Sequence, residues 1–182
     1  FTVLSFLSTT GFESADWQAA RDWSGLGTPG LILMGLAMIG GGVATTAGGV
    51  RLLRVYALYL HAQREFERLV HPSSVGRASV AGRRIRRQGA YIAWLFFMLF
   101  ALSLTAITAL FALAGLDFEA ALILALAGLS STGPLIQSAS DVPVMLAALG
   151  AGGKIVLVAG MILGRIEILA LVALLNPANW RA

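Results

Sequence analysis

Long apolar segments alternate with short polar ones along this chain, and their lengths predict helices at membrane depth. Residues 23–50 and 88–116 contain no charged side chain. Each exceeds the roughly 20 residues that a membrane-spanning helix needs. Within this pattern, residues 90–114 are predicted to form an uninterrupted spanning helix and residues 154–175 another. The chain is therefore predicted to be an all-α integral membrane protein.

Other segments predict helices that are short or broken. Residues 1–8 read as the end of a short helix, and residues 117–129 are helical by composition but too short to cross a membrane. Residues 28–60 form a long apolar segment that the string "GGGVATTAGGV", residues 40–50, interrupts. Residues 140–153 are predicted to be a polar, glycine-rich connection.

Composition and charge agree with a membrane location. The chain is 58% hydrophobic and 12% charged, against about a quarter charged in soluble domains. Most Lys and Arg residues lie between Arg51 and Arg87, so the loop predicted for residues 61–89 and the C-terminal end are expected in the cytoplasm. The same rule explains the net charge of +4 without nucleic acid. The absence of Cys excludes disulfides and thiolate metal sites.

Two blocks of sequence recur at nearly constant spacing. "LSTTGF", residues 7–12, matches "LSSTGP", residues 129–134, and "LILMGLAMIGGG", residues 31–42, matches "IVLVAGMILGRI", residues 155–166. This indicates a duplicated unit of helix, short helix, Thr-Gly turn and helix. Both copies have the same orientation, which predicts parallel repeats around an axis along the membrane normal.

The repeated Thr-Gly turn is the strongest functional signal. Non-helical backbone at membrane depth must be buried in protein or line a water-filled cavity. Carbonyl and hydroxyl oxygens from several such turns can replace the hydration shell of a cation, and oxygen ligands favour an alkali ion over a transition metal. The alternative interpretation is that Ser-Thr-Gly only caps and turns a re-entrant hairpin.

The glycine-rich break and Arg165 also have two interpretations each. The break is either a close-packing contact between helices or an unwound intramembrane segment below the turns. A phosphate loop is not indicated, because no Gly-Lys-[Ser/Thr] ending follows. Arg165 lies near the middle of the last span, where a charge is costly. It is either a structural tether to a carbonyl or a cationic latch bound to the carbonyls of residues 40–49.

The residues are compatible with more than one function. A cation pore fits the paired turns, and a Na⁺/K⁺ carrier working by alternating access shares the broken helices. An intramembrane hydrolase would use Ser130 or Ser131 as nucleophile, but no base lies in the same membrane layer in an evident pair. Because the chain opens "FTVLSF", with no initiator Met and no signal-peptide pattern, we expect a piece of something longer. Two turns cannot encircle an ion, so we expect this piece to be inactive without its N-terminal half.

The strings "STTGF", "IGGGVATTAGGVRLLR" (39–54), "STGP" and "LGRIEIL" (163–169), in this order, resemble the TrkH/KtrB/HKT potassium transporters. That family arranges four helix–pore-loop–helix repeats in one chain. The resemblance implies a potassium-uptake protein rather than an enzyme, covering the third filter turn through the fourth repeat. It divides the chain into a partial third repeat (1–61), a cytoplasmic Arg-rich linker (62–89) and a complete fourth repeat (90–182).

The resemblance also implies roles for individual residues. The ion-binding selectivity filter would comprise Thr9, Thr10, Gly11, Ser131, Thr132 and Gly133. The gate would comprise Gly40, Gly41, Gly42, Thr45, Thr46, Gly48, Gly49 and Arg165. K⁺ would be the transported ion, bound at the filter residues only, and no cofactor is expected. Ser131 and Leu135 depart from the residues that the family often has in this turn.

The resemblance further implies partners and a location. The expected partners are the missing N-terminal repeats of the same protein, a second copy in a homodimer, a cytoplasmic nucleotide-binding regulatory subunit and membrane lipid. The expected location is the bacterial inner membrane, crossed several times.

Overall fold

The computed structural model describes residues 1–25, 29–42, 47–71, 79–80, 83–84, 87–139 and 145–166. Its elements are α1 (Thr2–Leu7), α2 (Trp17–Ser24), α3 (Pro29–Ile39), α4 (Leu52–Val70), β1 (Ser79–Val80), β2 (Arg83–Arg84), α5 (Arg87–Leu113), α6 (Phe118–Ser130), α7 (Leu135–Ser138), η1 (Leu146–Ala148) and α8 (Ala151–Ile166). Apart from the two-residue strands, which pair antiparallel, the described elements are helical. The predicted all-α class is confirmed.

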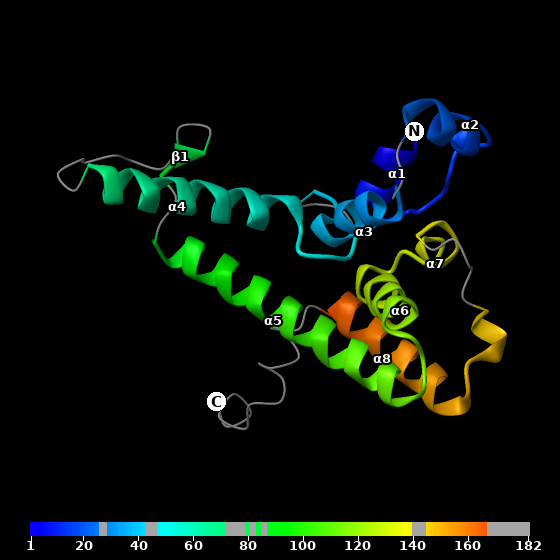
Figure 1. Ribbon diagram of the computed structural model, residues 1–182. Coiled ribbons are helices and arrows are strands. Elements are labelled where there is room, and N and C mark those ends of the chain that lie inside the picture. The colour runs from blue at the N-terminus through cyan, green and yellow to red at the C-terminus, as the bar shows by residue number, and fades with distance from the viewer. Residues whose placement is uncertain are drawn as a thin grey trace, which may run out of the picture.

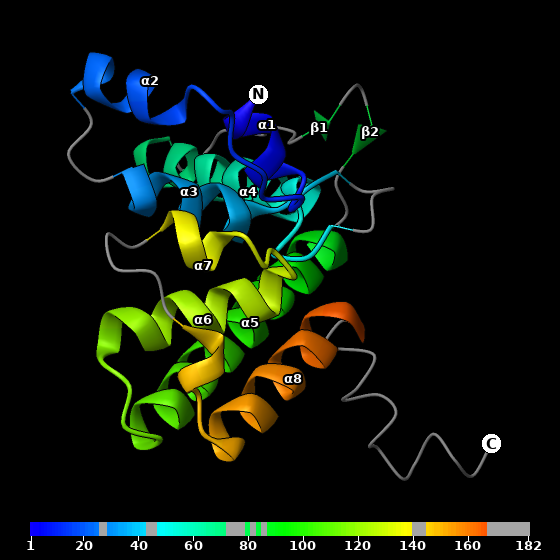
Figure 2. The same ribbon diagram turned by 90° about the vertical axis from the view of Figure 1, so that its right-hand side faces the viewer.

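The helices form two layers that meet along α3, α6 and α7. Helices α1–α4 make one layer and α5–α8 the other (Figure 1). A view at right angles shows α7 between α3 and α6 (Figure 2). Contacts of α3 with α6 and α7, and of α4 with α5, hold the layers together.

Helix α5 is the clearest membrane span. Its segment Gly89–Leu113 has 25 residues and a mean hydropathy of 2.3, as predicted for residues 90–114. Among the described residues it is the one helix long and apolar enough to cross a bilayer by length and composition. Helix α6 is shorter, as expected for a helix that does not cross. Helix α8 is described to Ile166, and the rest of the span predicted to residue 175 lies outside the described residues.

The interruption predicted between two apolar segments is present between α3 and α4. Gly40 and Gly49 both have positive φ, 69° and 81°, which non-glycine residues rarely adopt. Two backbone hydrogen bonds close the base of the excursion, from Val50 N–H to Met38 O at 2.9 Å and from Leu52 N–H to Gly41 O at 3.1 Å. We call residues 40–49 the break.

Two predicted boundaries were wrong. Residues 61–70, expected to be loop, form the second half of α4, so the linker boundary at residue 62 falls inside a helix. This stretch consists largely of good helix formers, and Arg68 pairs with Glu65 at 2.9 Å along the helix. The connection predicted for residues 140–153 is also shorter, because α8 begins at Ala151 and η1 occupies Leu146–Ala148.

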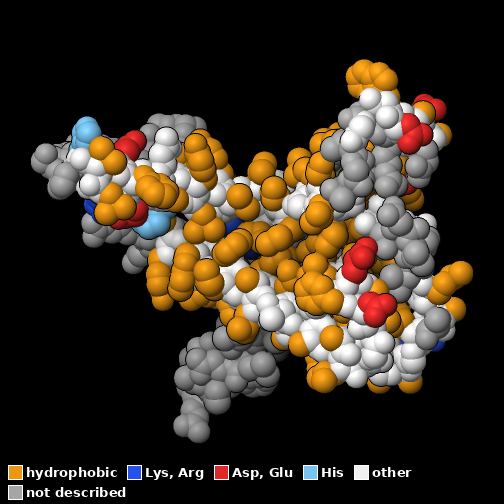
Figure 3. Space-filling model, viewed as in Figure 1, with side chains coloured by type: hydrophobic (Ala, Val, Ile, Leu, Met, Phe, Trp, Pro, Cys, Tyr) orange, Lys and Arg blue, Asp and Glu red, His pale blue; other side chains and the backbone are white. Residues whose placement is uncertain are grey.

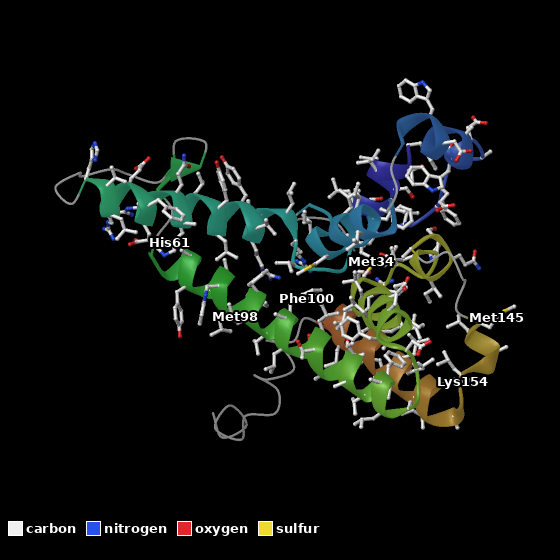
Figure 4. The ribbon with its side chains drawn as sticks, in the orientation of Figure 1. Met34, His61, Met98, Phe100, Met145 and Lys154 are labelled. Atoms are coloured by element: carbon white, nitrogen blue, oxygen red, sulfur yellow. The ribbon has the colours of Figure 1, made fainter. Side chains whose placement is uncertain are left out.

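Helix α6 lies at the centre of the packing. Every residue from Ile123 to Ser130 is buried, between α3, α5 and α8. The outer helices expose large apolar side chains, which cover much of the visible face in Figure 3. On α5, Met98 is 43% exposed whereas Phe100, two positions on, is 6% exposed (Figure 4). An apolar exterior of this kind suits contact with lipid or with further helices.

Candidate functional site: the paired Thr-Gly turns

The two predicted turns end their helices with the same hydrogen-bond pattern. After α1, Thr9 N–H donates to Phe6 O at 3.1 Å and Thr10 N–H to Ser5 O at 2.9 Å. After α6, Ser131 N–H donates to Gly128 O at 3.1 Å and Thr132 N–H to Ala127 O at 3.0 Å. Each pair is a Schellman motif. The sequence repeat is therefore also a repeat of backbone structure.

Both motifs place a hydroxyl residue where glycine is usual. One residue just past each helix is left-handed: Thr9, two positions after Leu7, has φ 58°, and Ser131, directly after Ser130, has φ 57°. A side chain in this region costs roughly 1–2 kcal/mol. Such strain is concentrated at functional sites, where the surrounding structure holds it in place. Its recurrence marks these two turns as the candidate site.

The glycines of the two turns differ in conformation. Gly11 is left-handed with φ 83°, and a Cβ there would lie 2.7 Å from Thr132 Cγ2, so the two turns touch. Gly133 does not have positive φ. It precedes Pro134, which restricts the residue before it. A Cβ at Gly133 would meet nothing within 4 Å. Glycine is therefore required by conformation and packing at residue 11, but by neither at residue 133.

A cavity of about 510 Å³ lies beside both glycines. Gly11 and Glu13 line it from the first turn, Gly133 from the second, and Leu157 and Met161 from α8. The structure thus brings the two predicted filter glycines to one space, together with the helix that carries Arg165.

The threonine hydroxyls are held by serines that the sequence did not single out as partners. Thr132 is fully buried, and Ser130 Oγ donates to its Oγ1 at 3.0 Å. In the other turn, Ser8 Oγ and Thr10 Oγ1 lie 2.9 Å apart. The available signal was the Ser at the same place in "LSTTG" and "LSSTG". Because Ser130 bonds to Thr132 and is paired with no base among the described residues, the arrangement does not resemble an activated nucleophile.

The backbone carbonyls are used differently in the two turns. Those of Thr132 and Gly133 accept N–H groups of Leu135 and Ile136, each at 3.2 Å, as the chain enters α7. In the part of the chain that the structure describes, no N–H donates to the carbonyls of Thr9, Thr10, Gly11 and Ser131. These oxygens are the ones available to a ligand without competition from the backbone.

The break meets the C-terminal end of α6, directly before the second turn. A Cβ on Gly48 would contact the carbonyl of Ser130, and a Cβ on Gly164 of α8 would contact the carbonyl of Leu129. Gly40 and Gly41 are buried, and Gly42 is partly buried. Thr45 and Thr46, also predicted for the gate, lie outside the described residues.

Arg165 lies in the last turn of α8 and its side chain is exposed. It follows Leu157 and Met161 at intervals of four residues, so it shares their helix face, which lines the cavity. No hydrogen bond joins Arg165 to those residues of the break that the structure describes. The structure therefore places Arg165 near the helix face of two cavity-lining residues, but it does not show the expected latch.

Comparisons with known proteins agree on one family. The model of the family described as TrkH, cation transport protein, matches residues 1–181. The chain is 30% identical over 181 residues to the Trk system potassium uptake protein TrkH of Salmonella typhimurium and 33% identical over 185 residues to that of Halomonas elongata. Each match covers 100% of this chain and 36% of the relative.

A solved structure gives the same answer for the fold. The crystal structure of the potassium transporter TrkH from Vibrio parahaemolyticus superposes with a TM-score of 0.81 at 30% identity, over 97% of this chain and 36% of that one. The chain thus spans roughly a third of the length of the proteins it matches. With a family model that matches nearly every residue, the chain belongs to the TrkH family of cation transport proteins.

Proposed function

We propose that this chain forms part of the pore of a potassium-uptake transporter. The observation that carries the proposal is the pair of turns with the same strained backbone, in contact where Gly11 meets Thr132. The relatives are named potassium uptake proteins, which favours K⁺ as the permeating ion. In this proposal the filter residues are those named from the sequence: Thr9, Thr10, Gly11, Ser131, Thr132 and Gly133.

The free carbonyls of Thr9, Thr10, Gly11 and Ser131 are the proposed ion ligands, because carbonyl oxygens can replace a hydration shell. The Thr132 hydroxyl has another role here, since it is already bonded to Ser130. Two turns cannot surround an ion. The proposal therefore includes further turns from a longer polypeptide, in which these residues are the third filter turn and the fourth repeat.

The proposed gate consists of the break and Arg165. The break lies against the end of α6 through Gly48, and Arg165 follows Gly164, which contacts the same end of α6. A guanidinium near the ion path would repel K⁺ over a short distance, and it offers five donors to backbone carbonyls. We propose that it holds the break across the path.

The setting of the protein is part of the proposal. The chain would cross the bacterial inner membrane several times, with the Arg-rich linker and the C-terminal end in the cytoplasm. The partners would be a second copy and a cytoplasmic nucleotide-binding regulatory subunit. The exposed apolar faces of α5 and α8 would contact lipid or the remaining repeats.

Gly133 gives the sharpest test of the filter. A Cβ meets nothing within 4 Å at this position, so a substitution tests charge and ion binding rather than packing. In the complete gene product, Gly133→Asp should abolish Rb⁺ uptake in a bacterium that lacks its own potassium uptake, because a carboxylate beside the path binds the cation too tightly. Gly133→Asn, of nearly the same size, is the matched control and should retain more uptake.

The outcomes separate the alternatives. Normal Rb⁺ uptake by Gly133→Asp, at normal expression, would contradict the filter assignment. Purified protein in liposomes then distinguishes a pore from a carrier working by alternating access. Flux that rises with driving force without saturation supports the pore, and saturating flux supports the carrier.

A further inference from the structure

Ser130 occupies an unusual position between the break and the second turn. Its side chain is fully buried at the C-terminal end of α6. Its hydroxyl donates to Thr132 Oγ1 at 3.0 Å, and the return contact from Thr132 Oγ1 to the Ser130 carbonyl is 3.5 Å. Ser130 thus fixes the side chain of Thr132, a proposed filter residue, through this hydrogen bond.

The same residue touches the break through its backbone. A Cβ added to Gly48 would contact the Ser130 carbonyl oxygen and lie 2.6 Å from the carbonyl carbon and 2.8 Å from Cα. Backbone packed this closely, with only a glycine hydrogen between, has little compressibility and transmits strain from one segment to the other. A displacement of Gly48 therefore changes the surroundings of the residue that holds Thr132.

We propose that Ser130 is a positioning residue that couples the break to the ion selectivity of the filter. When the break lies against α6, Ser130 fixes Thr132, and Thr132 in turn packs beside Gly11 of the other turn. When the break moves, Thr132 loosens and discrimination between K⁺ and Na⁺ falls. This inference deepens the proposed function and rests on it.

The other turn supplies an internal control. Ser8 and Thr10 form the equivalent hydroxyl pair at 2.9 Å. Ser8 is exposed, and it is not among the nearest neighbours of the described glycines of the break. Both serines would position a threonine, but Ser130 alone of the two would transmit the position of the break.

The experiment measures the ratio of Rb⁺ to Na⁺ flux per purified molecule of the complete gene product in liposomes. Gly48→Ala should lower this ratio by about twofold to thirtyfold, the range seen for changes along coupled networks. Gly35→Ala is the matched control, because a Cβ there meets nothing within 4 Å, and it should leave the ratio unchanged. The effect of Gly48→Ala should persist in a Ser8→Ala background and be largely lost with Ser130→Ala.

A purely structural role for Ser130 would lower the yield of folded protein without changing the ratio. If Gly48→Ala effects are the same in both serine backgrounds, the coupling is contradicted. If Gly48→Ala yields no folded protein, the Ser130→Ala variant decides by itself. It should lower the ratio of Rb⁺ to Na⁺ flux, because it frees the Thr132 side chain. A ratio equal to that of the wild type would overturn the inference. Absence of Rb⁺ flux in the wild type contradicts the proposed function and this inference with it, whereas normal flux with unchanged ratios contradicts the inference alone.

Discussion

Thr9 and Ser131 adopt almost the same left-handed backbone angle, φ 58° and 57°, at equivalent positions of the two turns. Neither residue is favoured in this conformation. In each turn, the N–H of the next residue donates to the carbonyl five positions before it, inside the preceding helix. Each turn therefore keeps a costly conformation that glycine would relieve. This makes the strain itself open to experiment.

Ser131→Gly should raise the melting temperature of the purified protein and lower its Rb⁺ flux. Relief of the left-handed strain is worth about 1 kcal/mol. The hydroxyl contributes no compensating bond, because Ser131 Oγ is buried without a hydrogen-bond partner among the described residues. Ser131→Ala removes the unpartnered hydroxyl but keeps the strain, so its melting temperature should stay below that of the glycine variant. Equal melting temperatures for the Gly and Ala variants would show that the strain is not stored in the native state.

Gly11→Ala should abolish Rb⁺ uptake, because its Cβ would lie 2.7 Å from Thr132 Cγ2 and separate the two turns. Gly25→Ala is the matched control. Gly25 is also left-handed, with φ 63°, but a Cβ there meets nothing within 4 Å. Both variants should lose about 1 kcal/mol of stability from the backbone angle alone. Loss of uptake in both to the same degree would attribute the effect to folding and not to contact between the turns.

Arg165→Gln, and separately deletion of residues 44–47, should raise ion flux per molecule and weaken its dependence on the proposed regulatory subunit. The first change removes the positive charge that is proposed to face the ion path, and the second shortens the segment that it is proposed to hold. The double variant should add little, because both changes act on one latch.

The latch has a clear competitor in a structural tether. A tether predicts that Arg165→Gln yields less folded protein with unchanged flux per molecule. Uptake by liposomes, normalised to purified protein, decides between them. Flux equal to or below that of the wild type would eliminate the latch.

The proposed orientation predicts labelling from opposite sides of the membrane. Ala15 and Gln63 are both exposed, and this chain contains no Cys, so Ala15→Cys and Gln63→Cys introduce distinct thiols. In a background without other Cys, an impermeant thiol reagent should label residue 15 in intact cells and residue 63 only after the membrane is opened. Labelling of residue 63 in intact cells would reverse the topology.

The sequence predicted the features that depend on local pattern. The uncharged run gave α5, and the repeated "LS-Thr/Ser-TG" strings located both turns, since glycine and hydroxyl residues determine such turns through short-range sterics and hydrogen bonds. The break was also predictable, because clustered glycines disfavour a continuous helix.

Other features arise only from tertiary contacts. The contact between Gly48 and Ser130 joins segments far apart in the chain and leaves no local signal. The different use of carbonyls depends on α7, a four-residue helix whose first N–H groups reach back to Thr132 and Gly133. The extension of α4 to Val70 was missed because the Arg-rich composition indicated cytoplasmic location, which says nothing about helicity.

The two hydrogen bonds that close the base of the break, Val50 N–H to Met38 O and Leu52 N–H to Gly41 O, make the excursion a stem-closed loop. Its ends stay paired whatever lies between them, and each doubling of a flexible loop's length costs only about 0.6 kcal/mol. Insertions and deletions at the tip can therefore accumulate during divergence without a shift in the register of the flanking helices. With the break as the proposed gate, a change in the number of residues in this one loop would alter how tightly the gate closes, while the flanking helices keep their register.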